Sequence, residues 1–290
     1  MRFLYDVPAP AKLNLFLHII GQRPDGYHLL QSVFMLIDWC DTLHFEVRED
    51  GQIQREDLLQ PLPADDLIVR AARALQQAAN CRLGVRISIE KRIPAQAGMG
   101  GGSSDAASCL LALNRLWQLD FSLQKLKQIG LRLGADVPFF LQGHNAWVEG
   151  VGEKITPLRG ALALPQARFL VVKPTAGIAT EAIFSAADLK RDCATATIAG
   201  FAAEHYGFGQ NVLQPVAQRL CADVSDAINW LASHQLQGRM TGSGSAVFAQ
   251  TQQETDLTDA PSGWQIRACS NLDVHPLAGW ASSDISVDGF

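Results

Sequence analysis

The sequence predicts an α+β protein made of two domains. Segments with the patterns of strands and helices are interleaved without a regular strand–helix–strand repeat, which argues against a Rossmann or barrel fold. A stretch rich in Pro, Gly and Ala at residues 157–165 separates two patterned halves. The chain has 290 residues, enough for two modest domains. We therefore expect an N-terminal domain at 1–158 and a C-terminal domain at 159–290.

The first half begins with strand-like segments. Residues 13–20 are rich in β-branched and aromatic side chains, which favour a strand. Two further strands are expected at 31–37 and 43–48, around a turn near Cys40-Asp41, and a polar loop at 49–64 follows them. The other elements expected in this half are a helix at 65–79 that Asp65 can cap, a strand at 85–89, helices at 104–117 and 122–133, and a short strand at 147–148.

The second half repeats this mixture of strands and helices. Residues 169–172 form a short apolar run of the kind found in buried strands. The remaining elements expected here are helices at 210–221 and 223–233 and strands at 236–240, 245–250 and 264–269.

Composition bounds the class of protein. The formal net charge is -5 and no run of Lys and Arg stands out, so nucleic acid or a membrane surface has little support as a partner. The six cysteines form no C-x-x-C pair, which favours reduced thiols. No stretch approaches the roughly 20 apolar residues of a membrane helix, and the N-terminus lacks the apolar core of a signal peptide. We expect a cytoplasmic protein that is a monomer or a weak homodimer.

A glycine-rich loop is the strongest chemical signal. Four glycines fall within the five positions 98–102, and Ser103-Ser104-Asp105 and an alanine-rich helical stretch follow. Glycines allow positive φ and close approach to a ligand, so Gly101 and Gly102 are expected to serve one of these purposes. The N–H groups of the loop and the positive end of the helix would then form an anion site. The alternative is a flexible loop before an N-capped helix. No Lys-Ser/Thr pair follows the last glycine, so this is not a Walker A loop.

Three segments together resemble the GHMP kinases, a family named for galactokinase, homoserine kinase, mevalonate kinase and phosphomevalonate kinase. The first is Pro10-Ala11-Lys12-Leu13-Asn14-Leu15, the second is the loop from Pro94 to Ala107, and the third runs from Met240 to Phe248. The resemblance extends from about residue 8 to residue 276. It implies a ribosomal-protein-like N-terminal domain, a ferredoxin-like C-terminal domain and an active site in the cleft between them.

Three more segments are similar to one branch of this family. They are Asp25-Gly26-Tyr27-His28, the run from Leu133 to Phe140, and Asn271-Leu272-Asp273-Val274-His275-Pro276. This similarity implies ATP-dependent phosphorylation of the 2-hydroxyl of 4-diphosphocytidyl-2-C-methyl-D-erythritol, in the non-mevalonate route to isoprenoid precursors. The implied cofactors are ATP and Mg²⁺, and the implied partner is this small cytidine diphosphate-linked substrate.

The resemblance assigns catalysis to Lys12 and Asp136. Taken alone, Asp136 reads as a turn or helix-terminus residue, and Lys12 reads as a lysine at the edge of a strand. In the family's motifs, Asp136 would be the base toward the substrate hydroxyl, while Lys12 would stabilise the developing charge. Asn14 lies two residues from Lys12 and so faces the same side of a strand. A polar pair on one face of an otherwise apolar strand argues against a purely structural core role.

The resemblance also assigns binding residues. Tyr27 could stack on cytosine, His28 could hydrogen-bond its edge and Phe184 could supply the opposite stacking face. The alternatives are a surface aromatic for Tyr27 and a surface imidazole for His28, while the face of an amphipathic helix explains Phe184 as well. The residues predicted to bind substrate are Asn14, Tyr27, His28, Phe184, Gly242 and Ser243, the last two of which could instead form a tight hairpin. The residues predicted to bind ATP are Lys91, Pro94, Ala95, Gln96, Ala97, Gly98, Met99, Gly100, Gly101, Gly102, Ser103 and Ser104.

Several alternatives stay open. Lys91 is explained almost as well by a solvated strand end, and Ser103 and Ser104 by helix capping. The Mg²⁺ ligands are not identified, and Asp66 stands where the family often has Asn. The rival functions are another GHMP kinase, acting on homoserine or mevalonate, and a catalytically inactive nucleotide-binding sensor. The pair Tyr27-His28 disfavours the first, and intact Lys12 and Asp136 disfavour the second.

Overall fold

The computed structural model describes residues 1–282, and its strands join into a single ten-stranded sheet that runs through both halves of the chain. Along its main path the order is β3-β4-β2-β10-β7-β9-β8, while β1 pairs with β2, and β5 pairs with β2 and β6. The strands are β1 (Phe3–Gln22), β2 (His28–Arg48), β3 (Ile53–Asp57), β4 (Gly84–Glu90), β5 (Ala146–Gly150), β6 (Lys154–Pro157), β7 (Arg168–Lys173), β8 (Arg239–Met240), β9 (Val247–Thr251) and β10 (Gln265–Leu272).

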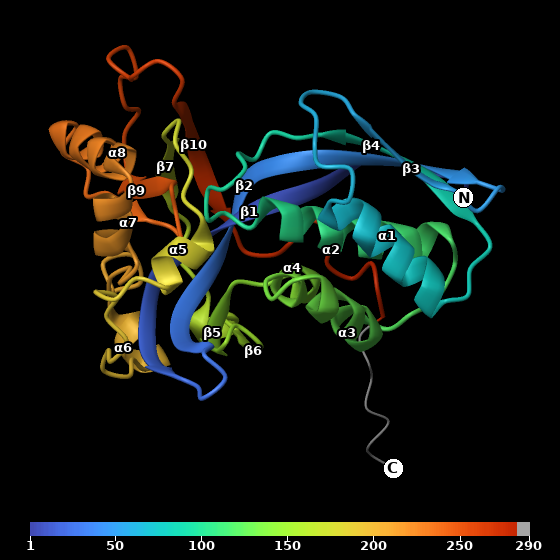
Figure 1. The fold of residues 1–290 in the computed structure, drawn as a ribbon, viewed down its shortest axis with the longest axis horizontal. Coiled ribbons are helices and arrows are strands. Elements are labelled where there is room, and N and C mark those ends of the chain that lie inside the picture. Colours follow the sequence, from blue (N-terminus) through green and yellow to red (C-terminus); the bar gives the residue numbers. More distant parts are fainter. Residues whose placement is uncertain (283–290) are drawn as a thin grey trace.

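Helices cover the sheet in both halves, which confirms the predicted α+β class. In Figure 1, α1 to α4 lie beneath the strands of the first half, and α5 to α8 gather around those of the second. The helices are α1 (Leu67–Ala78), α2 (Gly101–Leu116), α3 (Leu123–Leu133), α4 (Val137–Gln142), α5 (Thr180–Phe184), α6 (Ile198–Ala203), α7 (Gln214–Leu220) and α8 (Ala222–Ser233). A short 3₁₀ turn covers Gly160–Leu162. None of the helices in residues 1–282 has the length and apolarity needed to cross a bilayer.

Strands β1 and β2 form a long antiparallel pair at the centre of the first half. The strand expected at 13–20 is part of the twenty-residue β1. The turn expected near Cys40-Asp41 is wrong, because β2 continues through it from His28 to Arg48. A register shift between Pro10 and Lys12 absorbs the extra residues of β2. Asp41 is fully buried in this strand and accepts a hydrogen bond from the backbone N–H of Ile93 at 2.7 Å.

Several other boundaries differ from expectation. The loop expected at 49–64 contains β3, which pairs in parallel with β4 and which its polar composition concealed. Asp66 rather than Asp65 caps α1, accepting from the backbone N–H of Val69 at 3.1 Å. Helix α2 begins at Gly101, three residues earlier than expected, so two of the loop's glycines form its first turn. The strand expected at 236–240 is reduced to β8, and α5, α6 and β6 were not expected.

Two features tie the halves together. One is an aromatic cluster in which Phe16 of β1 lies 5.4 Å from Trp147, 6.1 Å from Phe201 and 5.1 Å from Phe208, measured between ring centroids. The other is the segment after β10, which returns to the first half, where the carbonyl of Ser282 accepts from the N–H of residue 123 at 2.9 Å.

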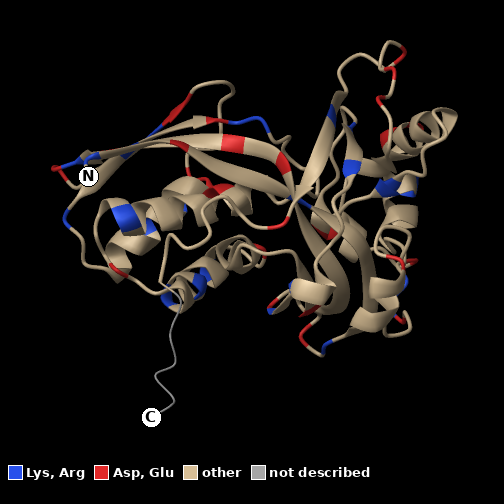
Figure 2. Ribbon diagram, turned by 180° about the vertical axis from the view of Figure 1, so that it is seen from behind, with Lys and Arg blue, Asp and Glu red and all other residues tan. Residues whose placement is uncertain are grey.

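The domain limits at 158/159 remain a prediction, and residues 283–290 of the second range lie outside the described part. Figure 2 shows acidic and basic residues interspersed over both halves.

Phe16 should be a stability hot spot because its ring is fully buried between the halves. Phe16→Ala should lower the free energy of unfolding by about 3–5 kcal/mol, the usual cost of removing a buried aromatic ring. Urea unfolding followed by circular dichroism measures it. The control is Phe3→Ala, whose ring is 58% exposed on the same strand and which should change stability by less than about 1 kcal/mol. Equal losses in the two variants would contradict a core role for Phe16.

Candidate active site

A cavity of about 910 Å³ lies between the glycine-rich loop, α1, α4 and the second half of the chain. This volume suits a small-molecule site, because ligand pockets usually span about 300–1,000 Å³. The structure places 17 of the 20 sequence-predicted site residues in its lining; they are Lys12, Asn14, Lys91, Pro94, Ala95, Gln96, Ala97, Gly98, Met99, Gly100, Gly101, Gly102, Ser103, Asp136, Phe184, Gly242 and Ser243. Ser104, Tyr27 and His28 are outside the lining.

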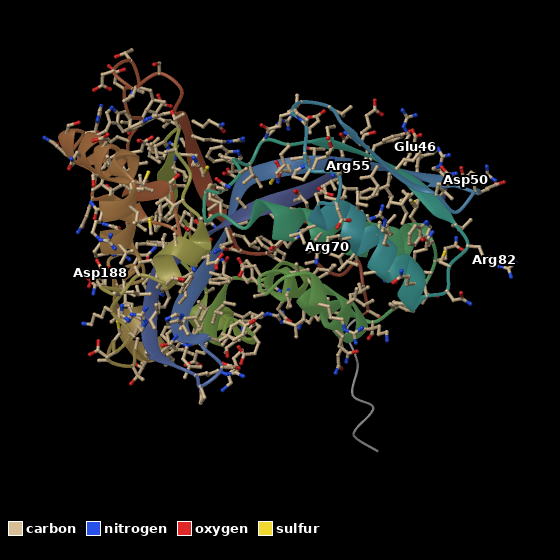
Figure 3. The ribbon with its side chains drawn as sticks, in the orientation of Figure 1. Glu46, Asp50, Arg55, Arg70, Arg82 and Asp188 are labelled. Carbon is tan, nitrogen blue, oxygen red and sulfur yellow. The ribbon has the colours of Figure 1, made fainter. Side chains whose placement is uncertain are left out.

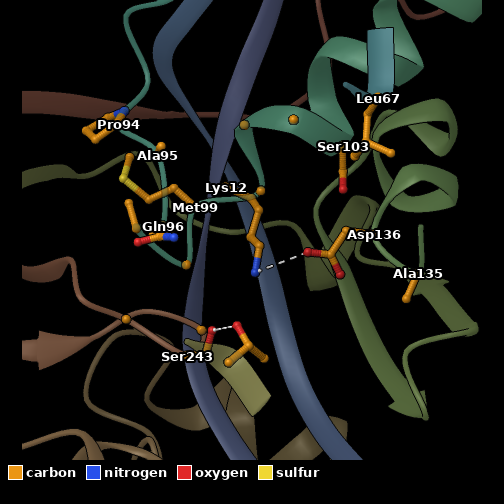
Figure 4. Close-up of a pocket in the computed structure, with 18 of the residues that line it drawn as sticks. Lys12, Leu67, Pro94, Ala95, Gln96, Met99, Ser103, Ala135, Asp136 and Ser243 are labelled. Atoms are coloured by element: carbon orange, nitrogen blue, oxygen red, sulfur yellow. Dashed lines mark hydrogen bonds and ion pairs between the residues drawn. The ribbon is translucent and has the colours of Figure 1, made fainter. Parts of the chain in front are cut away.

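Lys12 and Asp136 face each other across this cavity (Figure 4). The Lys12 ammonium lies 3.6 Å from Asp136 Oδ2, donates to the Asn14 carboxamide oxygen and lies 4.5 Å from the centroid of the Phe34 ring. The Asn14 side chain in turn donates to Ser32 Oγ at 2.9 Å. Lys12 is only 4% exposed. Burial lowers its pKa, and the charge of Asp136 opposes this shift. A buried cation held beside an accessible carboxylate can bind and polarise a hydroxyl group.

The start of α4 presents the Asp136 carboxylate to the cavity. Asp136 is the N-cap of this helix, but its side chain makes no capping hydrogen bond. Pro138 lies in the first helical turn, where its missing N–H costs nothing. Helix α3 ends at Leu133 with Gly134 as its C-cap, and α4 is a separate helix. With 29% of its side chain exposed, Asp136 keeps acceptor capacity for a ligand.

The glycine-rich loop reaches its conformation through Gly98 and Gly100, whose φ angles are both +70°. Gly101 and Gly102 do not have positive φ, because both belong to α2, so close approach to a ligand is the part of the expectation that stays a prediction. Gly101 is instead tightly packed, since a Cβ there would lie 2.9 Å from Ile93 Cγ2 and 3.0 Å from Lys91 Nζ. A Cβ on Gly102 would be 3.5 Å from the nearest atom, which is an ordinary contact.

A loop from the second half holds this glycine-rich loop in place. The N–H of Ser245 donates to the carbonyl of Gln96 at 3.1 Å, and Thr241 Oγ1 accepts from the N–H of Asn14 at 2.9 Å. A Cβ on Gly98 would overlap the carbonyl oxygen of Thr241 and lie 2.9 Å from the N atom of Gly244. The two loops therefore fix each other's backbone beside Lys12, whose own N–H donates to the loop at Met99 O, 3.0 Å away.

Two residues predicted to contact the nucleotide have hydrogen-bond partners within the protein. The Lys91 ammonium binds Asp41 Oδ2, and Asp105 Oδ2 lies 2.6 Å from it. Burial opposes the charge of Lys91, but the two carboxylates outweigh it and raise its pKa. Burial raises the pKa of Asp105 well above its usual range, and Oδ1 of this side chain has no hydrogen-bond partner. Ser104 donates to the carbonyl of Pro10 at 2.6 Å and so ties α2 to β1.

The three residues predicted to clamp a base are only partly assembled. The rings of His28 and Phe184 are in contact, with centroids 5.2 Å apart and planes at 37°. Tyr27 is 64% exposed and is not packed against Phe184 in the structure. Burial, and secondly the charge of Arg191, lowers the pKa of His28.

Sequence reasoning missed several cavity residues. Thr180 at the start of α5 lies with its Oγ1 2.7 Å from Ser243 Oγ, and no motif indicated that short helix. Arg70 of α1, labelled in Figure 3, also lines the cavity; the helical pattern alone could have placed it on the exposed face. Asp66 lines the cavity as well, and its charge is paired with Arg55 at 2.7 Å.

Sequence comparisons decide the family. The family descriptions "GHMP kinases N terminal domain" and "GHMP kinases C terminal" match residues 66–144 and 193–267. The chain is 70% identical over 284 residues to a protein of Albidiferax ferrireducens named 4-diphosphocytidyl-2-C-methyl-D-erythritol kinase, covering 98% of both chains. The chain belongs to the GHMP kinase family. A protein of the same name from Paracidovorax citrulli is 66% identical to this GHMP kinase and matches 98% of it and 100% of the relative.

Solved structures give the same family. A crystal structure of 4-(cytidine 5'-diphospho)-2C-methyl-D-erythritol kinase superposes with a TM-score of 0.77 at 32% identity, over 93% of this chain and 98% of the other. A homoserine kinase from Cytophaga hutchinsonii shares the fold with a TM-score of 0.68 at 13% identity, over 93% of this chain and 96% of the other. The resemblance inferred from three short motifs is therefore confirmed, as is the α+β GHMP kinase fold, and ATP is the phosphoryl donor of this family.

Gly98 and Gly102 should respond in opposite ways to an added methyl group. Gly98→Ala forces a Cβ onto a backbone at positive φ and against the Thr241 carbonyl, so stability should fall by at least about 2 kcal/mol. Gly102→Ala fits an open helical position and should raise stability by up to about 1 kcal/mol. Thermal and urea unfolding of both variants measure the difference. A Gly98→Ala protein as stable as the unaltered chain would contradict the interlocked loops.

Proposed function

We propose that this GHMP kinase transfers the γ-phosphoryl group of ATP to the 2-hydroxyl of 4-diphosphocytidyl-2-C-methyl-D-erythritol. The observation that carries the proposal is the pairing of Lys12 with Asp136 in a cavity that has a glycine-rich anion site on one side and Phe184, beside His28, on the other. The names of the relatives at 70% and 66% identity supply the substrate. Action in the cytoplasm, as a monomer or weak homodimer, remains a prediction.

Asp136 and Lys12 divide the chemistry between them. The Asp136 carboxylate accepts the proton of the substrate hydroxyl as its oxygen attacks the γ-phosphorus, and the bond from that phosphorus to the β-γ bridging oxygen breaks to release ADP. Lys12 stabilises the negative charge that develops on the attacking oxygen and the transferred group. Its burial strengthens this interaction because little water screens the ammonium.

The glycine-rich loop would hold the phosphates of ATP. The backbone N–H groups at the start of α2 point along the helix axis, and the helix dipole favours an anion at this end. Gly100 and Gly102, which lack side chains, leave the backbone accessible on the cavity side. Helix α2 has sixteen residues, which is long enough for a substantial helix dipole.

Mg²⁺ fits this site as an ion carried by ATP. Within residues 1–282, no three His, Cys, Asp or Glu side chains are grouped to hold a metal by themselves. Mg²⁺ in kinases is usually bound by one or two protein groups together with the nucleotide's phosphates. Ser103, which lines the cavity at the start of α2, and the exposed part of the Asp136 carboxylate have the oxygen ligands it prefers. When bound, the ion neutralises phosphate charge.

The opposite end of the cavity would bind the cytidyl group. Phe184 lines the cavity and offers a flat apolar face, and Ser243 and Gly242 lie between it and the glycine-rich loop, where a diphosphate would pass. Homoserine and mevalonate carry no base to fill this end. Turnover of the cytidyl substrate, with homoserine and mevalonate as alternatives, separates the proposal from its rivals in a coupled ADP-release assay. ATP binding without turnover of any of the three would favour an inactive sensor.

Asp136→Asn and Lys12→Met should each reduce kcat at least roughly a hundredfold while substrate binding persists, because each removes one catalytic group. If the pair acts as a unit, the double variant should be little slower than the slower single variant. Asp136→Asn also removes the negative charge that raises the pKa of Lys12 against the effect of burial, so this pKa should fall further. Steady-state kinetics and calorimetric binding provide the measurements. Near-normal kcat for Asp136→Asn would refute its role as base.

Tyr27→Ala tests whether the exposed ring closes on the base. Stacking on an aromatic ring is worth about 1–3 kcal/mol, so the KM for the cytidyl substrate should rise roughly ten- to a hundredfold, while the KM for ATP stays unchanged. The control is Tyr5→Ala. Tyr5 is a second exposed tyrosine, 51% exposed, near the N-terminus and outside the cavity lining. An equal effect of Tyr27→Ala on both KM values would remove Tyr27 from the base site.

A further inference from the structure

Arg191 connects Phe184, which lines the proposed cytidyl end of the cavity, with His28, which lies beside it. It lies in the loop after α5, and four hydrogen bonds from its guanidinium group are directed at that region. Nε donates to His28 Nε2 at 3.0 Å, Nη1 donates to the carbonyl of Leu189 at 3.0 Å, and Nη2 donates to the carbonyls of Phe184 at 3.1 Å and Ala186 at 2.9 Å.

These bonds fix the end of α5. Phe184 is the last residue of the helix, and its carbonyl is one of the groups that a helix C-terminus leaves without an internal partner. Arg191 supplies that partner and also places a positive charge at the negative end of the helix. The backbone that carries the Phe184 ring is thereby fixed relative to the loop.

The same guanidinium determines the state of His28. An arginine N–H can only donate, so His28 Nε2 must be unprotonated and the imidazole proton must be on Nδ1. Burial, and secondly the charge of Arg191, lowers the pKa of His28, which favours the neutral ring. His28 therefore presents a single defined donor, Nδ1–H, next to the Phe184 ring.

Arg191 has little capacity left to bind a phosphate itself. A guanidinium group has five N–H donors, and the bonds to four acceptors use all but one of them. Bidentate recognition of a phosphate needs two free parallel donors. The geometry thus favours an indirect role over direct contact with the substrate's diphosphate.

We infer that Arg191 is a positioning residue that holds His28 and Phe184 together as one recognition surface for the cytidyl group. The inference rests on the proposed function, which supplies the cytidyl substrate. Because one side chain joins the start of β2 to the end of α5, it couples the first half of the chain to the second at the substrate end only. It should thus control affinity for the cytidyl substrate and not affinity for ATP.

Arg191→Met and Arg191→Lys test this inference by kinetics. Both should raise the KM for the cytidyl substrate roughly tenfold or more, because binding must then order the two rings, while kcat and the KM for ATP change by less than about threefold. Lysine should not restore affinity, since its ammonium cannot reproduce the planar fork. The control is Arg219→Met, which breaks an exposed pair with Asp188 at 2.7 Å. Asp188, on the same loop, lies at the outer margin of the molecule in Figure 3.

A ¹⁵N NMR measurement of His28 supplies a signature that general destabilisation would not give. The unaltered, ligand-free protein should show the Nδ1–H tautomer at neutral pH, and folded Arg191→Met should show a mixture or the Nε2–H form. The Nε2–H tautomer in the unaltered protein, or an unchanged cytidyl KM in a folded variant, would overturn the inference. If the unaltered protein does not turn over the cytidyl substrate, the proposed function fails, while the NMR result still decides whether Arg191 controls His28.

Discussion

The buried ammonium of Lys12 is the constraint around which the site is organised. A cation with only 4% of its surface exposed must be compensated by its neighbours, because burial strongly disfavours an isolated charge. Its partners come from separate parts of the chain: Asn14 from β1, Asp136 from the start of α4, and the Phe34 ring from β2. Each element must therefore be correctly placed before Lys12 can remain charged. The same requirement brings a carboxylate and a cation to one point in the cavity.

The second half of the chain contributes to this organisation through the backbone more than through charged groups. The loop with Thr241 and Ser245 hydrogen-bonds to β1 and to the glycine-rich loop, and Gly98 has no room for a side chain at that contact. Since a phosphate site built from N–H groups depends on backbone direction, this contact would make the proposed phosphate site depend on both halves. A single sheet running through both halves gives the contact a rigid base.

Sequence reasoning predicted the features that short motifs and periodicity encode. Lys12, Asp136 and the glycine-rich loop were placed in one cavity, and α1, α3 and α8 were found close to their true limits. The errors arose where distant residues decide the local conformation. Asp41 reads as a turn residue, but its partner Lys91 is fifty positions away and keeps it inside β2. Arg191 carried no local signal, because its role appears only when β2 and the end of α5 meet.

The cluster of Lys91, Asp41 and Asp105 places two buried carboxylates beside a single ammonium group. One ammonium cannot neutralise two buried carboxylates, and residual negative charge beneath the first turn of α2 would oppose phosphate binding there. Burial raises the pKa of Asp105 well above its usual range, which favours the neutral form of that carboxyl and so reduces the excess charge. Asp41 also accepts hydrogen bonds from the backbone N–H groups of Arg92 and Ile93. The cluster can thus hold the base of the glycine-rich loop without placing excess negative charge beside the proposed anion site.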